Sequence, residues 1–302
     1  MNKPRWKVWV QAARLRTLPL ATAAVFLGSG LAAEASQFRF PVFIFCLLTA
    51  IGLQVLSNLA NDYGDAVSGA DNEDRVGPQR TVVSGLITKV QMTRAMLLVG
   101  VLTIISGLTL LWTAFSGDWM AILTFVGFGV LALIAAVTYT VGRRPYGYRG
   151  LGDLSVFLFF GLLGVLGTYY LFTQTFDLWL ILPAASCGFL ASAVLNINNI
   201  RDMETDIASG KFTFAVRIGR TWARRYHWVL VAGAFVLTAI FNLACQHGWS
   251  VWLYLPAVIP LFKAALTVST SEDPVLLDKQ LKATAMGSLF FNLLLAIGFA
   301  LN

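Results

Sequence analysis

Acidic residues gather in two short clusters of this 302-residue chain, which together hold eight of its fifteen Asp and Glu residues. The first cluster contains Asp62, Asp65, Asp71, Glu73 and Asp74, and the second contains Asp202, Glu204 and Asp206. Converging carboxylates repel one another unless a cation lies between them. Mg²⁺ prefers oxygen ligands and is commonly held by a few carboxylates together with substrate phosphates. The clusters therefore predict a magnesium site that binds a phosphorylated molecule.

Each cluster extends a stripe of polar residues at helical spacing. The stripes are Asn58, Asp62 and Asp65 in the first cluster, and Asn198, Asp202 and Asp206 in the second. Residues three or four apart lie on one face of a helix, which can be turned toward the interior of a bundle. The arrangement occurs twice, about 140 residues apart, a weak internal repeat that predicts one site between two halves of a single domain, about 1–142 and 143–302.

Basic residues near the clusters suit the same anion. They are Arg75, Arg80, Arg143, Arg144 and Lys211. Ordinary charges at solvated helix ends would also account for most of these Lys and Arg residues. For the two Asn/Asp stripes we favour a site, because carboxylates at a membrane edge are costly and usually functional.

The elements that must position these residues are membrane helices. The chain is 57% hydrophobic and only 12% charged, whereas soluble proteins carry about 25% charged residues. Seven uncharged runs are long enough for a span, and they cover 17–33, 40–61, 95–117, 119–142, 154–176, 178–200 and 283–302. An eighth run, 226–262, is long enough for two helices that turn at 245–250. We therefore expect an all-α bundle of nine transmembrane helices, since continuous apolar runs exclude the alternation of barrel strands.

The loop charges predict the orientation. If alternate loops share one side with the N-terminus, that side receives 21 of the 22 Lys and Arg residues, and only Arg39 lies on the other. By the positive-inside rule the N-terminus is cytoplasmic and the C-terminus is outside. The net charge of +7 is then an orientation signal in a lipid bilayer, and we expect no nucleic-acid partner.

Two other interpretations of these features are open. The N-terminal 35 residues imitate a signal peptide, with Lys3, Arg5 and Lys7 before an apolar run and small residues around Glu34. Eight further spans make a cleaved leader unnecessary, so we interpret this segment as the first span. A secondary transporter also uses repeated halves and membrane carboxylates, but it predicts charges near the bilayer midplane, whereas here they cluster at one edge.

The residues of both clusters resemble a known family. Asn61-Asp62-Tyr63-Gly64-Asp65 with Gly69 and Asp71, and Asp202-x-x-x-Asp206 followed by Lys211, resemble the two Asp-rich motifs of the UbiA family of intramembrane aromatic prenyltransferases. Segments 16–21, 58–78, 138–148 and 195–211 look like the branch of that family that acts on 1,4-dihydroxy-2-naphthoate. One position departs from the first motif, because Gly69 stands where the family has a third aspartate, and Asp71 follows two residues later.

The resemblance implies an activity. A polyprenyl group passes from polyprenyl diphosphate to 1,4-dihydroxy-2-naphthoate with loss of CO₂ and diphosphate, which gives demethylmenaquinol for menaquinone biosynthesis. Another aromatic acceptor, such as 4-hydroxybenzoate, is the alternative. The resemblance places the enzyme in the bacterial inner membrane with its site facing the cytoplasm, and we expect no obligate protein partner.

The resemblance also implies residue roles. Mg²⁺ is expected on Asp62, Asp65, Asp202 and Asp206, with Asp71 as a further ligand. The diphosphate is expected to contact Arg80, Arg143 and Lys211, while Asn58 and Asn198 orient the ligands. Departure of diphosphate leaves an allylic cation, and we expect the ring of Tyr139 or Tyr63 to stabilise it by cation–π attraction.

Overall fold

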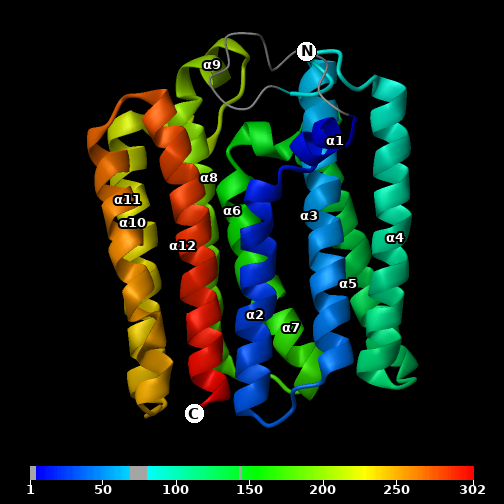
Figure 1. The fold of residues 1–302 in the computed structure, drawn as a ribbon, viewed down its shortest axis with the longest axis vertical. Coiled ribbons are helices and arrows are strands. Elements are labelled where there is room, and N and C mark those ends of the chain that lie inside the picture. The colour runs from blue at the N-terminus through cyan, green and yellow to red at the C-terminus, as the bar shows by residue number, and fades with distance from the viewer. Residues whose placement is uncertain (1–4, 69–79, 143–144) are drawn as a thin grey trace.

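The computed structural model of the chain describes residues 5–68, 80–142 and 145–302, and within these ranges the chain forms helices and no strand. The α-helices are α1 (Arg5–Ala13), α2 (Leu18–Glu34), α3 (Phe40–Ser68), α4 (Lys89–Phe115), α5 (Trp119–Thr138), α6 (Gly152–Val156), α7 (Gly164–Thr173), α8 (Ile181–Arg201), α9 (Met203–Ala208), α10 (Phe214–Ala244), α11 (Leu255–Thr270) and α12 (Pro274–Ala300). A π-helix, Phe157–Leu163, joins α6 to α7. Figure 1 shows the long helices side by side along one axis.

Nine segments of the described chain are long and apolar enough to cross a bilayer, which confirms the predicted number. α1 and α2 together form one of these segments, and α6, the π-helix and α7 form another. The predicted turn is also confirmed, since α10 ends at Ala244 and a short 3₁₀-helix begins at Trp249 before α11. An odd number of crossings agrees with Figure 1, in which α1 and the C-terminus lie at opposite ends of the bundle.

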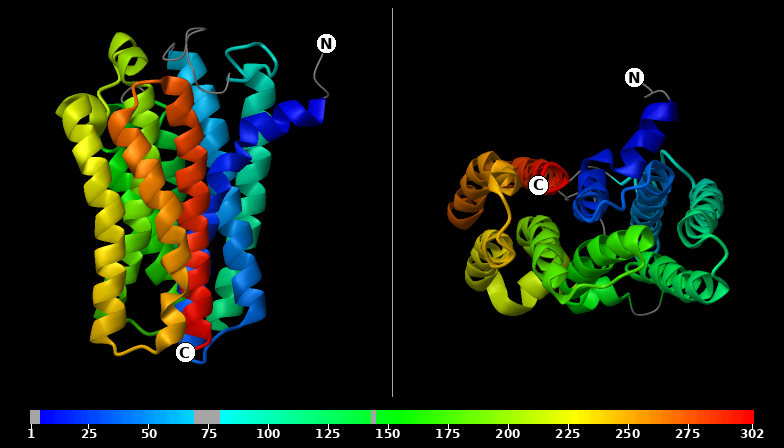
Figure 2. Two further views of the ribbon diagram at one scale, coloured as in Figure 1. Left: turned by 60° about the vertical axis from the view of Figure 1, so that its left-hand side comes forward. Right: turned by 90° about the horizontal axis from the view of Figure 1, so that it is seen from below.

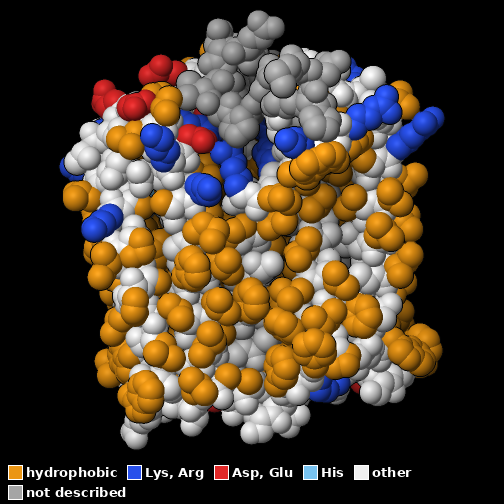
Figure 3. Space-filling view, viewed as in Figure 1, with side chains coloured by type: hydrophobic (Ala, Val, Ile, Leu, Met, Phe, Trp, Pro, Cys, Tyr) orange, Lys and Arg blue, Asp and Glu red, His pale blue; other side chains and the backbone are white. Residues whose placement is uncertain are grey.

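Charged side chains gather at the end of the bundle that holds α9 and the last turns of α3. Figure 3 shows Lys, Arg, Asp and Glu at this end, above a broad surface of hydrophobic side chains. α1 also lies at this end and projects away from the other helices, as the left view of Figure 2 shows. The fold thus places Asp62 and Asp65 of the first acidic cluster and the whole second cluster at one edge of the apolar layer, as their positions in the sequence predict.

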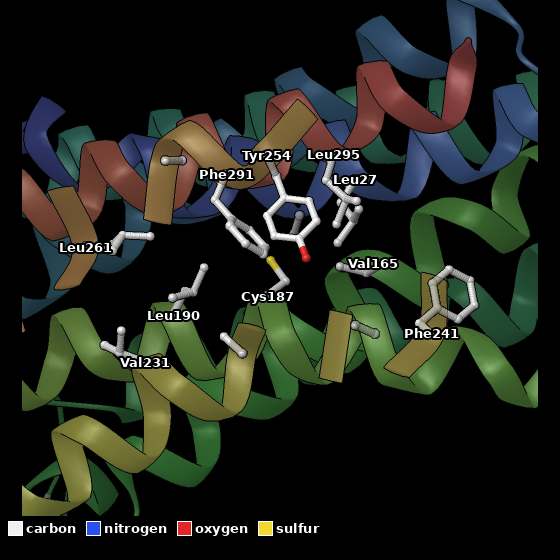
Figure 4. Packing of buried hydrophobic residues seen from close by; sticks show 14 of the residues in the cluster. Leu27, Val165, Cys187, Leu190, Val231, Phe241, Tyr254, Leu261, Phe291 and Leu295 are labelled. Atoms are coloured by element: carbon white, nitrogen blue, oxygen red, sulfur yellow. The ribbon is translucent and has the colours of Figure 1, made fainter. Parts of the chain in front are cut away.

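The main hydrophobic core joins the second half of the chain to α2. Figure 4 shows ten labelled members of this core: Leu27, Val165, Cys187, Leu190, Val231, Phe241, Tyr254, Leu261, Phe291 and Leu295. Close packing of α2 on α12 needs glycine at position 30, because a Cβ there would lie 2.4 Å from the Cα of Ala296. Small residues at such contacts let membrane helices approach closely.

Arg39, the single basic residue predicted at the opposite end, has a structural role. Its guanidinium donates to the carbonyls of Ala114 (3.1 Å) and Thr113 (3.4 Å) at the end of α4. It also donates to Leu171 (2.6 Å) and Phe172 (3.1 Å) near the end of α7. The last carbonyls of a helix have no partner within the helix and carry partial negative charge. Arg39 therefore joins two helix C-termini far from the acidic clusters.

Candidate active site

A cavity of about 530 Å³ extends from polar and charged side chains at the charged end of the bundle to apolar side chains farther along the helices. Residues of α2, α3, α4, α5, α8 and the α6–α7 span line it. Its polar wall contains Gln54, Asn58, Asn61, Asp65, Arg80, Asn198, Asp202, Asp206 and Lys211. The structure thus brings residues of both acidic clusters to one site, with an apolar space beside it.

The end of α3 carries Asp62 and Asp65 of the first cluster without a break, because the helix continues to Ser68. Thr140, which follows α5, fixes this end by donating from its hydroxyl to Asn61 Oδ1 (2.9 Å) and to the carbonyl of Ala60 (3.2 Å). Gly64 permits this approach, since a Cβ there would lie 2.7 Å from the Thr140 carbonyl oxygen. Asn61 was not among the predicted site residues, although it belongs to the first motif.

Asp65 is buried and held by cations from distant parts of the chain. Lys211 Nζ lies 3.2 Å from its Oδ1, and Arg80 donates to its Oδ2. The Tyr148 hydroxyl also donates to Oδ1, and Lys211 lies 4.7 Å from the centre of the Tyr148 ring. The structure therefore places predicted Asp65, Arg80 and Lys211 together and adds Tyr148, which spacing along the sequence did not indicate.

Asp62 is turned toward a different part of the chain. Its Oδ2 accepts from the Thr81 amide (3.0 Å) and the Thr81 hydroxyl (2.8 Å), and its Oδ1 accepts from the Val82 amide (3.1 Å). The Asp62 side chain is buried and does not line the cavity, whereas Asn61 and Asp65 do. We expected Asp62 to be a magnesium ligand, but in the structure its carboxylate accepts hydrogen bonds from Thr81 and Val82.

Asn58 lines the cavity and also holds the connection between α1 and α2. The side-chain nitrogen Nδ2 of Asn58 donates to the Ala13 carbonyl (2.9 Å) and to the Thr17 hydroxyl (2.9 Å). The side-chain oxygen Oδ1 of Asn58 accepts from Gln54 Nε2 (3.2 Å). Asn58 thus orients backbone and neighbouring polar groups at the cavity wall.

The second cluster lies where α8 ends and α9 begins, with Asp202 between the two helices. The Arg201 guanidinium contacts both carboxylate oxygens of Asp202 at 2.7 Å and donates to Asn198 Oδ1 at 2.9 Å. Arg201 also pairs with Asp278 of α12, which in turn pairs with Arg16 at 3.0 Å. Such two-pronged pairs are among the stronger charged contacts. Sequence reasoning missed Arg201 because a basic residue at a helix end on the predicted cytoplasmic side is also an ordinary orientation signal.

Asp206 reaches the same cavity from α9, the short helix that follows Asp202. Its amide donates to the Asp202 carbonyl at 2.8 Å, and its own carbonyl accepts from the Lys211 amide at 2.8 Å. This local fold sets Asp206 on the cavity wall and directs the chain back so that Lys211 can reach Asp65. The i, i+4 spacing of Asp202 and Asp206 is therefore kept across a break between two helices.

Two tyrosines form an aromatic part of the cavity wall. The rings of Tyr139 and Tyr146 meet edge to face, with centres 5.3 Å apart. Burial raises the pKa of the Tyr139 phenol, and the negative charge of Asp153 raises it further. Burial also raises the pKa of Tyr146, whose hydroxyl lies 3.0 Å from Ser155 Oγ. Both phenols are thus neutral at physiological pH. Tyr63, the other predicted aromatic residue, packs against a hydrophobic cluster around Leu59 instead.

The donor set suits a hard cation, because it consists of carboxylate and amide oxygens. Within the ranges that the structure describes, no three Asp, Glu, His or Cys side chains form a ready-made metal site. Cationic side chains contact Asp65 and Asp202 instead. Two predicted residues, Asp71 and Arg143, lie outside the described residues.

The profile of the UbiA prenyltransferase family matches residues 21–300. The chain belongs to this family. A curated relative, "1,4-dihydroxy-2-naphthoate octaprenyltransferase" of Escherichia coli K12, is 48% identical over 301 residues and covers 99% of this chain and 96% of its own length. A relative of the same name from Haemophilus influenzae is 45% identical and covers 100% of this chain and 98% of its own length.

Solved structures of UbiA homologues share the fold. The apo homologue from Aeropyrum pernix K1 superposes with a TM-score of 0.66 at 16% identity, covering 92% of this chain and 96% of that one. A homologue from Archaeoglobus fulgidus bound to GPP and Mg²⁺ superposes with a TM-score of 0.58 at 15% identity, covering 94% of this chain and 100% of that one. The resemblance drawn from the Asp-rich motifs is confirmed at the level of the family.

Proposed function

We propose that this UbiA-family chain transfers a polyprenyl group from polyprenyl diphosphate to 1,4-dihydroxy-2-naphthoate, releases CO₂ and diphosphate, and so forms demethylmenaquinol. The observation that carries the proposal is a cavity lined by cations and carboxylates in one part and by apolar side chains in the rest, because a prenyl diphosphate has a charged head and an apolar tail. The names of the relatives from E. coli and H. influenzae support the naphthoate acceptor and menaquinone biosynthesis.

The charged head is proposed to lie between the two acidic clusters. Asp65, Asp202 and Asp206 would hold Mg²⁺ there, and Asn61 and Asn198 line the same cavity. The bound ion supplies Lewis-acid neutralisation of the diphosphate charge. The A. fulgidus homologue, whose structure holds GPP and Mg²⁺, supports binding of a prenyl diphosphate and Mg²⁺ by a protein of this fold. Asp71 and Arg143 remain predicted contributors from outside the described ranges.

Cations that now hold Asp65 are proposed to stabilise the leaving group. Arg80 and Lys211 line the cavity and carry fixed positive charge, so they favour the charge that builds on the diphosphate oxygen as the C–O bond breaks. The electron pair of that bond departs with diphosphate. Tyr139 presents an aromatic face to the resulting allylic cation, and cation–π attraction in a dry site is worth about 2 kcal/mol.

The acceptor ring then attacks the allylic carbon through the position that bears its carboxyl group. The new C–C bond takes an electron pair from the ring, and loss of CO₂ returns a pair to it. No ring proton leaves in this balance, so the carbon that reacts needs no general base. Apolar side chains in the rest of the cavity would keep water from the allylic cation, which water would otherwise capture.

An assay of two acceptors tests the function. Purified protein in detergent with farnesyl diphosphate and Mg²⁺ is expected to release diphosphate and CO₂ with 1,4-dihydroxy-2-naphthoate. Preference for 4-hydroxybenzoate would keep the prenyltransferase proposal and overturn the acceptor. Movement of naphthoate across proteoliposomes without any chemistry would overturn the enzyme itself in favour of a transporter.

The site is proposed to face the cytoplasm, with the N-terminus inside and the C-terminus outside the bacterial inner membrane. The distribution of 21 of 22 Lys and Arg residues supports this orientation. The chain provides its own reporter, because Cys245 is exposed at the opposite end from α9 while Cys46 and Cys187 are buried. A membrane-impermeant maleimide should label Cys245 in intact spheroplasts, and Cys245→Ser should abolish the labelling. Labelling only after permeabilisation would reverse the orientation.

A further inference from the structure

Two aspartates three residues apart on α3 hold two consecutive residues of another segment. Asp65 pairs with the side chain of Arg80, and Asp62 accepts from the amide and hydroxyl of Thr81 and from the amide of Val82. Both carboxylates are buried, with 1% and 2% of Asp65 and Asp62 exposed. Arg80 lines the cavity, whereas Thr81 and Val82 begin the turn that leads to α4.

We infer that Asp62 is a positioning residue: it fixes the backbone after Arg80 so that the Arg80 guanidinium is held at Asp65 and the cavity mouth. The inference rests on the proposed function only in naming the diphosphate as the anion that Arg80 meets. It assigns Asp62 a role other than the magnesium ligand that the motif predicts.

Helix geometry explains why neighbouring members of one motif divide in this way. With 100° per residue, Gln54, Asn58, Asn61 and Asp65 fall within a stripe about 60° wide, and all four line the cavity. Asp62 falls about 40° beyond Asn58, outside this stripe and on the side that faces the turn. Its side chain therefore contacts the Thr81–Val82 backbone while Asp65 contacts the cavity.

The three donors occupy both oxygens of Asp62. A carboxylate offers about four lone-pair sites, and three of them accept hydrogen bonds of 2.8 to 3.1 Å from Thr81 and Val82. Coordination of a cation through the occupied lone pairs of Asp62 would leave buried backbone amides without their acceptor, which is unfavourable. Asp65, by contrast, meets side chains from other segments that can move to a substrate.

The turn that Asp62 holds has its own internal order. The Ser84 amide donates to the Arg80 carbonyl (3.0 Å), and the Ile87 amide donates to the Thr81 carbonyl (3.1 Å). Gly85 supplies a positive φ of 69°, which other residues seldom adopt. Val82 and Ile87 pack in a cluster with Leu59 of α3. Asp62 therefore attaches a well-formed turn to α3 at the residue next to Arg80.

Kinetics of Asp62→Asn separate positioning from coordination. If Asp62 is a positioning residue, Asp62→Asn should raise the KM for farnesyl diphosphate about ten- to a hundredfold, because charged hydrogen bonds are lost. The Mg²⁺ concentration that gives half of the maximal rate should then change less than about twofold. Arg80→Gln should raise KM similarly, and the double variant should add little to either change. If Asp62 is instead a magnesium ligand, the Mg²⁺ concentration for half-maximal rate should rise at least about tenfold, as expected for Asp65→Asn. The effects of Asp62→Asn and Arg80→Gln on KM should then be additive. That result would overturn the inference.

Thr81→Val gives a second test that leaves both acidic residues intact. It removes one donor to Asp62 and cannot remove a magnesium ligand. Positioning predicts a KM up to about tenfold higher, and an unchanged KM would contradict it. Thr93→Val, which removes the hydroxyl of an exposed residue on α4, is the matched control and should leave KM unchanged.

Hydrogen exchange tests the contact without any reaction, so it distinguishes failure of the inference from failure of the proposed function. Asp62→Asn should speed exchange of the Thr81 and Val82 amides at least about tenfold, while Asp65→Asn should leave both protected. If Asp62→Asn leaves these amides as protected as in the parent protein, the turn does not depend on Asp62 and the positioning role is wrong. This result stands whether or not the protein transfers a prenyl group.

Discussion

The ends of α3 and α8 carry similar stripes of Asn and Asp, yet the structure uses them differently. At α8 all three members, Asn198, Asp202 and Asp206, line the cavity. At α3 the stripe divides, since Asp65 lines the cavity and Asp62 holds a turn. The difference follows from the local fold: α3 continues as one helix to Ser68, whereas α8 ends and the chain turns into α9. Similar spacing therefore does not ensure similar function when the helix continues in one case and ends in the other.

The two ends also differ in how their carboxylates are neutralised. Asp202 is paired by the residue that precedes it, Arg201, which is fully buried. Asp65 is paired by Arg80 and Lys211, of which Lys211 is 146 residues away. The α8 site is thus assembled largely by local sequence, while the α3 site exists only when both halves of the chain have come together.

Loss of either central carboxylate should have the largest effect, because both ends serve one site. Asp65→Asn and Asp202→Asn should each lower kcat by at least about a hundredfold, the usual effect of removing one electrostatic contribution to a transition state. Diphosphate release at saturating donor and Mg²⁺ measures this. If one of the two variants keeps a near-normal rate, the carboxylate that it lacks is not needed for the reaction, and only the other helix end contributes to it.

Arg201→Met should lower stability more than Arg80→Met. Arg201 is buried between Asp202 and Asp278, so its removal leaves buried negative charge and should cost about 3 kcal/mol. Lys211 still neutralises Asp65 when Arg80 is removed. Thermal unfolding in detergent compares the two variants. If Arg201→Met and Arg80→Met lower stability equally, the distinction between Arg201 as a local partner and Arg80 as a long-range partner would be contradicted.

Arg39→Gln should lower stability by about 2 kcal/mol without lowering kcat, because it removes charged hydrogen bonds to α4 and α7 at the end opposite the site. Thermal unfolding and diphosphate release on the same preparation check both parts. A large loss of kcat at a temperature where the variant is folded would show that the two ends of the bundle are coupled.

Glu204→Gln should have the smallest effect and serves as the matched control for the acidic variants. Glu204 lies between Asp202 and Asp206 in the sequence, but its side chain is 90% exposed and its pair with Arg220 is 3.3 Å. Exposed pairs contribute little, so stability should change by less than about 0.5 kcal/mol and kcat should be unchanged. A strong loss of activity would extend the site onto the outer face of α9.

Much of the fold follows from local pattern. Uncharged runs predict nine spans, and the 245–250 segment predicts the turn between α10 and α11, because crossing a bilayer sets a minimum apolar length. Asn61 could also have been found, since Gln54, Asn58, Asn61 and Asp65 form a polar stripe at helical spacing within an apolar run. That stripe indicates the cavity face of α3 better than the motif aspartates do.

The sequence by itself determined where charge meets the apolar layer, because the spacing of charges along a membrane helix is a local property. It did not determine which cation pairs with which carboxylate. Lys211 and Tyr148 reach Asp65, and Thr81 reaches Asp62, only because helix packing and turns bring distant segments together. Hydrogen bonds and ion pairs act over a few ångströms, so only the tertiary structure could decide that Asp65 faces the cavity while Asp62 holds the turn.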